Sequence, residues 1–488
     1  MELKFKYYLS TKKFIFLLCI IILPSISHAQ SVGSTGATAV DSLRRQFEKD
    51  ATQTVTDFEE YSKKALEEYE KYEAQARADY SRYTRSIKQT WGSDTIVDNT
   101  PTKWVEYSND YQNRSIVDFD QGKILVEVAL DNNNTVDTNA INTRLATAIE
   151  HLLKSQGSTC PYQSSVDVSK PLTNNPVLDG LVDFSMYKPD KTLSSTGKET
   201  TPTTTVKGQK LSLNTNQKKE SSGDTVSTGT TMARRVQEEG NKNSGNPLAD
   251  KREEAHKRAE QKTQGWQNEA EKAILVKTIA AQSPKKITKV KGDDGKVRQV
   301  VQIEMNLVSD NLSKNATLYK DLVAEFSQVF QIEQPLIFAV MEQESRFNPE
   351  ATSWVPAYGL MQLVPKSGGL DAYNYVYRNT WAPTRSYLFV PRNNIELGTA
   401  YLRVLMNQFS SVTDPHCRRL CVIASYNTGA GNVSRAFTGA TNLNKAIPLI
   451  NKYNYEQLYS HLTNRLSTSE ARNYVSGVSK RREKYLKP

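Results

Sequence analysis

The chain has 488 residues, of which 38% are apolar and 24% are charged, and its formal net charge is +10. This length exceeds one ordinary hydrophobic core and predicts two to four domains. The polar composition indicates that part of the chain does not pack into a core. No dense block of Lys and Arg with interleaved aromatic residues occurs, which argues against a nucleic-acid partner.

Residues 1–29 are predicted to be a secretory signal peptide. Four lysines precede an apolar run at 14–23, and small residues lead up to a cleavage point after Ala29. Ten apolar residues are too few to span a bilayer comfortably, so we expect an exported, periplasmic mature chain. Cleavage lowers the net charge to about +7, which suits an anionic polymer such as a cell wall.

The cysteines predict neither a disulfide framework nor a metal site. Cys19 leaves with the signal peptide, and Cys160, Cys417 and Cys421 remain. Three thiols cannot form a framework of bridges. Cys417 and Cys421, even with the adjacent His416, offer too few ligands for zinc. We therefore expect no metal and no cofactor.

Residues 30–91 are predicted to form one long helical segment with an eleven-residue repeat. The repeating positions are Phe58, Tyr69, Tyr80 and Trp91; Tyr61, Tyr72 and Tyr83; and Ala65, Ala76 and Ile87. Such a repeat gives 3.67 residues per turn and an apolar seam along the helix. We expect this seam to pack against a partner or the chain's own domain, with an aromatic sugar-stacking stripe as the alternative.

Residues 92–309 are predicted to form a small α+β N-terminal domain. The expected elements are strands at 116–119 and 124–130, a helix at 138–154, a charged helix at 247–281, a hairpin turn at 292–295 and a strand at 301–307. The last strand is expected to complete the sheet begun near residue 116. The tract at about 191–246 is rich in Thr, Ser, Lys, Gly and Asn, so we predict a disordered insertion.

Residues 310–488 read as helical throughout, which makes the chain α+β overall with an all-α C-terminal domain. Amphipathic patterns predict helices near 318–331, 395–409, 420–424 and 468–485. A segment of about 180 residues is a sensible size for one domain.

One further helix in this domain carries Glu344. Pro335 suits the first turn of a helix, and Leu336, Val340 and Glu344 then fall at helical spacing on one face. A carboxyl group on an apolar face resists ionisation, so its pKa rises, as a proton-donating acid at neutral pH requires. The plain alternative is a solvated carboxylate at the helix end.

Four short stretches accompany this acid in the same domain. They are Glu344-Ser345, Gly359-Leu360-Met361-Gln362, Ser425-Tyr426-Asn427 and the segment from Glu470 to Val475. Their order and content resemble the lytic transglycosylase domain of the lysozyme-like superfamily, with Ser425 in place of the usual Ala. Flanking segments, including WVEYSNDYQNRSIVDFDQGKILVEV and TRSYLFVPRNNIELGTAYL, resemble the membrane-bound lytic murein transglycosylase C family and its N-terminal domain.

The resemblance spans roughly 91–187 and 266–488, and leaves out the repeat helix and the polar insertion. It implies an exported enzyme that cleaves the β-1,4 bond between N-acetylmuramic acid and N-acetylglucosamine and leaves 1,6-anhydro ends. It implies Glu344 as acid and then base, since hydrolysing glycosidases use two carboxylates. It implies, for binding the glycan, Ser345, Met361, Gln362, Tyr426, Asn427, Glu470 and Tyr474.

Two alternatives stay open. A muramidase would use water in place of the muramic acid hydroxyl and needs a second acid, for which Glu396 and Asp371 are candidates. A non-catalytic wall-binding or envelope assembly protein would act through the long helix and the N-terminal domain.

The expected partners are peptidoglycan glycan strands and, because two segments lie outside the resemblance, an envelope-spanning protein complex. The family is typically anchored by a lipid. Here Cys19 lies inside the apolar run without a small residue before it, which argues against such an anchor and leaves peripheral association with the outer membrane open.

Overall fold

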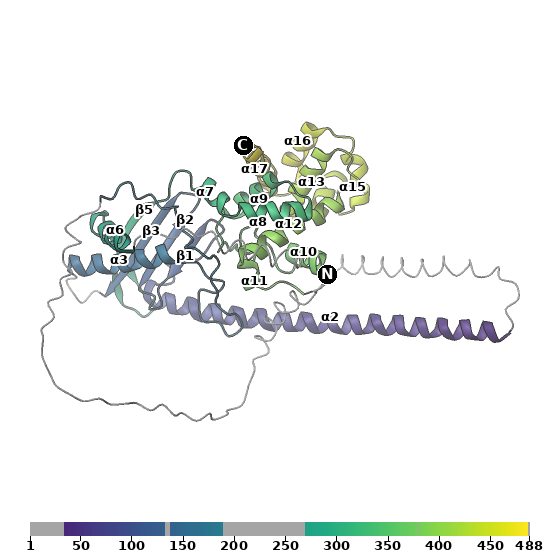
Figure 1. The fold of residues 1–488 in the computed structure, drawn as a ribbon, viewed down its shortest axis with the longest axis horizontal. Helices are drawn as coiled ribbons and strands as arrows, with labels where there is room; N and C mark the ends of the chain where they lie inside the picture. The colour runs from purple at the N-terminus through teal and green to yellow at the C-terminus, as the bar shows by residue number, and fades with distance from the viewer. Residues whose placement is uncertain (1–33, 132–136, 189–268, 380, 487–488) are drawn as a thin grey trace, which may run out of the picture. The chain divides into compact units, whose positions relative to one another are not determined.

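The computed structural model describes residues 34–131, 137–188, 269–379 and 381–486 (Figure 1). The predicted signal peptide and polar insertion lie outside these residues, as does most of the charged helix predicted at 247–281. The chain divides into two compact units, Met1–Glu67 and Glu68–Pro488. Among the described helices, none is long and apolar enough to cross a bilayer.

The long helix predicted near the N-terminus is confirmed as α2, Ser34–Trp91. The side chains of its first repeats, including Phe58, lie outside the described residues. Within the second unit, Tyr69, Tyr72 and Trp91 are buried, and the Trp91 indole N–H donates to the Tyr111 carbonyl at 2.7 Å. In this part of the helix the seam packs on the chain's own fold, which leaves these rings no free face for a sugar.

A five-stranded antiparallel sheet follows, in the order β1-β2-β3-β5-β4. Its strands are β1 Lys103–Tyr107, β2 Asn113–Asp118, β3 Lys123–Asp131, β4 Lys286–Lys291 and β5 Val297–Asn306. β3 and β5 pair at the centre, with Val126 opposite Ile303. The prediction that the strand after the polar insertion completes the sheet is therefore confirmed, whereas β1 and β4 were not predicted as separate strands.

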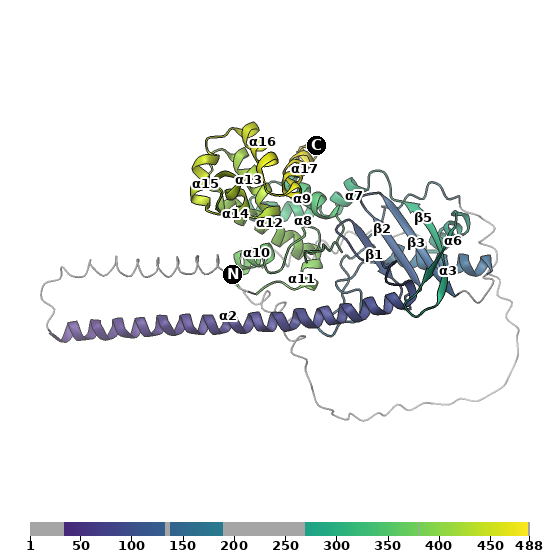
Figure 2. The ribbon, with the colours of Figure 1, turned by 180° about the vertical axis from the view of Figure 1, so that it is seen from behind.

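Alternation along the central strands gives the sheet two apolar faces. One face, which includes Val126 and Ile303, packs on helices α3, Thr138–Lys154, and α6, Glu269–Gln282. Figure 2 shows both helices on this side of the strands. Ala129 and Val300 belong to the other face and pack against Ile87 and Trp91 at the end of α2. The period of two thus builds a three-layered module.

Among the described residues after β5, all regular secondary structure is helical. These helices are α7 Asn311–Leu318, α8 Lys320–Phe330, α9 Gln334–Ser345, α10 Gly368–Tyr377, α11 Arg385–Phe389, α12 Pro391–Gln408, α13 Pro415–Thr428, α14 Ala430–Thr438, α15 Leu443–Ile450, α16 Tyr455–Arg465 and α17 Ser469–Leu486. The predicted helices correspond to α8, α9, α12, α13 and α17. Domain limits at residues 92 and 310 stay predictions.

Polar contacts tie the sheet module to the helical part. Arg346 Nε contacts Asp120 Oδ1 at 2.8 Å, and the Ser158 N–H donates to Glu350 Oε1 at 2.8 Å. Glu350 is buried, and burial raises its pKa to about 8. The chain thus places a second acid with a raised pKa away from Glu344, in the contact between the two parts.

Candidate active site

The acid predicted from sequence lies in the last turn of α9. Pro335 stands in the first turn of this helix, and Arg346 ends it in the left-handed region with φ 51°. Val340 and Leu336, one and two turns before Glu344, are fully buried. The helix therefore delivers the Glu344 carboxyl group along an apolar face, as predicted.

The Glu344 carboxyl group is half-buried and has one hydrogen-bond donor nearby. Tyr474 of α17 donates its hydroxyl to Glu344 Oε1 at 2.6 Å. Burial raises the pKa of Glu344 from 4.5 to about 8; the Tyr474 hydrogen bond lowers it, and the charge of Glu470 raises it. The raised pKa favours the protonated form at neutral pH, as a general acid requires.

Two tyrosines surround this acid. Tyr474 is buried, and Tyr426 of α13 donates its hydroxyl to the Met361 carbonyl at 2.8 Å. Burial first, and then the charge of Glu344, raise the pKa of both phenols well above the ordinary value. Both phenols therefore stay protonated and act as hydrogen-bond donors.

The segment Gly359-Leu360-Met361-Gln362 forms a tight turn that the bridge between Tyr358 and Leu363 closes. Gly359 has φ +75° and Gln362 has φ 47°, and the Gln362 N–H donates to the Gly359 carbonyl at 3.0 Å. Gln362 Nε2 donates to the Ala351 and Gly359 carbonyls, each at 3.0 Å. Its buried Oε1 has no hydrogen-bond partner among the described residues.

Ser345 and Met361, predicted to line the groove, are fully buried. The Ser345 hydroxyl donates to the Leu360 carbonyl at 2.8 Å, and the Met361 side chain packs against Gly398, where an added Cβ would meet its sulfur. These residues join α9, the turn and α12 to one another and expose no side-chain surface to a sugar. Met361 is therefore a core residue.

Asn394 is a positioning residue that the sequence reasoning missed. It is fully buried in α12, accepts the Met361 N–H at 2.7 Å and donates to the carbonyls of Tyr358 and Leu388. One side chain thus satisfies three backbone groups of the turn and its neighbour. An amide in the first turns of an apolar helix was the available signal.

Replacing Gly359 by Ala should unfold this turn. The positive φ disfavours any side chain, and an added Cβ would lie 2.6 Å from the Leu388 carbonyl oxygen. We expect a loss of about 2 kcal/mol or more in the free energy of unfolding, measured by urea denaturation. A matched Gly439→Ala variant, whose glycine also has positive φ but nothing within 4 Å, should lose less; equal losses would refute the steric argument.

Asn427 and Glu470 form an exposed pair at the edge of the site. Asn427 Nδ2 donates to Glu470 Oε1 at 3.0 Å and joins the end of α13 to the start of α17. Glu470 also acts on Glu344 through its charge. The four predicted stretches therefore converge around Glu344.

The two acids considered for a hydrolytic mechanism have other contacts. Glu396 is buried, and its Oε2 accepts the Tyr377 hydroxyl at 2.9 Å. Asp371 is exposed and acts electrostatically on Tyr401. The carboxylate whose charge acts on Glu344 is Glu470.

Ser425 is the one departure from the expected motif, and nothing in the structure explains it. Its hydroxyl is fully buried in α13 and has no hydrogen-bond partner among the described residues. An unpaired buried hydroxyl costs free energy, so Ser425→Ala should raise the free energy of unfolding by about 1 kcal/mol. Thermal denaturation measures the change. A lower melting temperature would mean that this hydroxyl is satisfied in solution.

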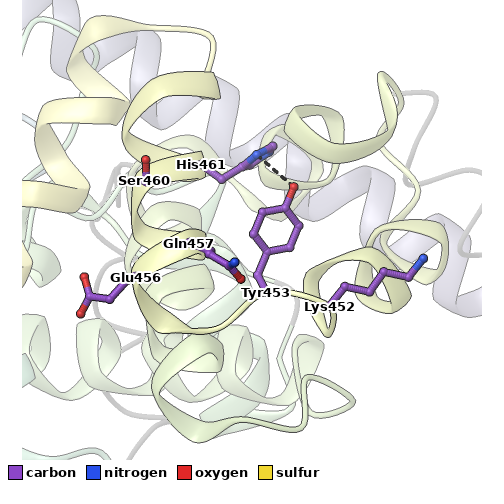
Figure 3. Close-up of a pocket in the computed structure, with 6 residues that line it drawn as sticks. All are labelled: Lys452, Tyr453, Glu456, Gln457, Ser460 and His461. Atoms are coloured by element: carbon purple, nitrogen blue, oxygen red, sulfur yellow. Dashed lines mark hydrogen bonds between the residues drawn. The ribbon is translucent and has the colours of Figure 1, made fainter.

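A separate pocket of about 640 Å³ lies beside α16 and is lined by Lys452, Tyr453, Glu456, Gln457, Ser460 and His461. Figure 3 shows Tyr453 turned toward His461, with Lys452 and Glu456 pointing away from each other. No predicted site residue lines it. Within the described ranges, no group of three His, Cys, Asp or Glu side chains could hold a metal ion, and Cys160, Cys417 and Cys421 are free thiols.

Comparison with known families gives the class of the helical part first. Residues 321–447 match the family model described as the transglycosylase SLT domain. This range of the chain includes Glu344, Gln362 and Tyr426. Residues 69–182 match a second model, the N-terminal domain of membrane-bound lytic murein transglycosylase C. The resemblance to the membrane-bound lytic murein transglycosylase C family is thereby confirmed.

The relatives named membrane-bound lytic murein transglycosylase C include a protein of Sodalis glossinidius (strain morsitans). It is 40% identical over 191 residues, which cover 39% of this chain and 52% of that protein. One from Cronobacter sakazakii (strain ATCC BAA-894) is 38% identical over 200 residues, 41% of this chain and 54% of that protein. The chain spans about half the length of the curated relatives it matches.

Among solved structures, the 70 kDa soluble lytic transglycosylase from Escherichia coli is 25% identical, with a TM-score of 0.28, over 36% of this chain and 26% of that chain.

The N-terminal family match begins at Tyr69. The prediction that the repeat helix lies outside the resemblance is therefore wrong for residues 69–91, the part of α2 whose end packs on the sheet module.

Proposed function

We propose that the protein is an exported lytic transglycosylase that cleaves peptidoglycan glycan strands. The observation that carries this proposal is Glu344, an acid with a pKa of about 8 inside a match to a transglycosylase SLT domain. We also propose a lysozyme-like fold for the helical domain. The names of the relatives, which describe a membrane-bound murein transglycosylase, support an envelope location and a glycan substrate.

In the first step Glu344 donates its proton to the bridging oxygen of the β-1,4 bond. The bond from this oxygen to C1 of N-acetylmuramic acid breaks, and N-acetylglucosamine leaves as the alcohol. Glu344 is now a carboxylate. Tyr474, whose hydroxyl already donates to Oε1, stabilises this charge.

In the second step the carboxylate takes the proton of the muramic acid C6 hydroxyl while the C6 oxygen bonds to C1. The product carries a 1,6-anhydro end, and Glu344 is protonated again, so the cycle needs neither water nor a second carboxylate. Gln362 Oε1, an acceptor without a partner among the described residues, is proposed to receive a donor group of the sugar, and Asn427 with Glu470 to contact a neighbouring saccharide.

The test is digestion of purified peptidoglycan followed by mass analysis of the released muropeptides. The proposal predicts products lighter by one water than the corresponding reducing sugars. Reducing ends would identify a muramidase, and no release would favour a wall-binding or envelope assembly protein. An envelope-spanning complex stays a proposal, to be tested by cross-linking in cells.

A further inference from the structure

Trp354 is the most exposed large apolar side chain that the structure describes. Its exposed fraction is 100%, and its neighbour Val355 is 63% exposed. Three other tryptophans, Trp91, Trp104 and Trp381, are at most 8% exposed. A fully exposed indole gains nothing for folding from its apolar surface, because that surface is not removed from water.

The loop that carries Trp354 is a closed hairpin. Thr352 and Tyr358 form an isolated bridge, and the Ser353 N–H donates to the Ala357 carbonyl at 3.2 Å. Pro356 adds a fixed φ within the tip. These constraints oppose a rearrangement in which the indole folds back onto the protein.

Hydrogen bonds connect this hairpin directly to the candidate active site. The Ala351 carbonyl at its base accepts Gln362 Nε2 at 3.0 Å and the Gly359 N–H at 2.9 Å. Trp354 stands ten residues after Glu344 and eight before Gln362. Trp354 therefore lies on the loop that connects Glu344 to the turn at residues 359–362.

The chemistry of the tip favours a saccharide over a membrane. Residues 351–359 contain no charged side chain, whereas segments that bind anionic lipid surfaces combine apolar residues with Lys or Arg. The indole face offers a flat π surface, which matches the C–H face of a pyranose ring. Enzymes that act on polymers gain from binding substrate units remote from the reacting bond.

We propose that Trp354 stacks on a sugar ring of the glycan strand away from the cleaved bond, and so adds a binding subsite. This inference rests on the proposed function. The predicted contact involves the indole face, so it depends on an aromatic ring at position 354 and not on apolarity alone.

The test uses the full mature chain carrying Glu344→Gln, so that bound strands are not cut, and glycan strands freed of their stem peptides. Trp354→Ala should raise the dissociation constant about tenfold, which corresponds to about 1.4 kcal/mol. Trp354→Tyr should recover most of the affinity, and Trp354→Leu should not. Leu318→Ala, a control at a side chain that is 56% exposed, should bind as its parent does. Bound strands should also protect the Trp354 fluorescence from iodide.

Unchanged binding by Trp354→Ala would overturn the inference, as would equal affinities for the Tyr and Leu variants. Trp354→Ala could instead lose binding to phosphatidylethanolamine–phosphatidylglycerol vesicles and keep binding to glycan strands. That result would show that the hairpin tip contacts a membrane. The proposed function fails separately: it fails if the wild-type protein forms no anhydro ends, whatever the Trp354 variants bind.

Discussion

Glu344→Gln is expected to lower the rate of glycan cleavage by at least about 1,000-fold, because general acid–base catalysis contributes about 10² to 10⁴ and one group serves both steps. Gln fills the same volume and accepts the Tyr474 hydroxyl, so the fold should persist. Release of soluble muropeptides from purified peptidoglycan measures the rate.

The chain offers a matched control for this substitution. Glu350 is also buried and also has a pKa raised to about 8 by burial, but it contacts Ser158 and Asn99 in the sheet module. Glu350→Gln should keep cleavage within about fivefold of wild type. A comparable loss in both variants would mean that a buried acid, and not the position of Glu344, governs activity.

Glu344→Gln should also change how stability depends on pH. The folded-state pKa of Glu344 lies above the ordinary 4.5, so its contribution to stability is present below that value and is lost as pH rises toward 8. The variant lacks this loss. Its melting temperature relative to wild type should therefore increase between pH 5 and 9; a constant difference would contradict a raised pKa.

Removing the two groups that act on Glu344 should move the pH profile in opposite directions. The Tyr474 hydrogen bond lowers the pKa of Glu344 and the charge of Glu470 raises it. The rate should fall as pH rises through about 8, because the acid must start protonated. Tyr474→Phe should shift this alkaline limb to higher pH, with a loss of about tenfold or more in rate, and Glu470→Gln should shift it to lower pH.

The measurement is the rate per unit enzyme at limiting substrate between pH 5 and 10, where the limb reports the free enzyme. Shifts in the same direction for both variants would contradict the assignment of Glu344 as the titrating acid. An Asn427→Ala variant, which frees Glu470 from its hydrogen-bond donor, separates the effect of charge from that of geometry.

Periodic patterns predicted the elements that bury one face. Helix α9, the central strands β3 and β5, and the raised pKa of Glu344 all follow from apolar residues at fixed spacing. The edge strand β4 was not predicted, because its residues are mostly exposed on both faces and show no alternation of burial.

The roles within the site could be predicted only in part. The order of the motifs predicted that Tyr426, Asn427 and Tyr474 belong to one site with Glu344. It could not distinguish a side chain that faces this site from one that supports it. Met361 is buried against Gly398. Asn394 contacts three backbone groups, two of which, in Tyr358 and Met361, are distant in sequence. Such contacts are set by tertiary packing and leave no local pattern.

Digestion of peptidoglycan in water enriched in heavy oxygen tests the central claim most directly. If Glu344 acts twice and the C6 hydroxyl is the nucleophile, the new muramic acid ends should contain no label, and the leaving N-acetylglucosamine should carry only the original bridging oxygen. Heavy oxygen at C1 of the new ends would show that water attacks, which would contradict a lytic transglycosylase and identify a hydrolase.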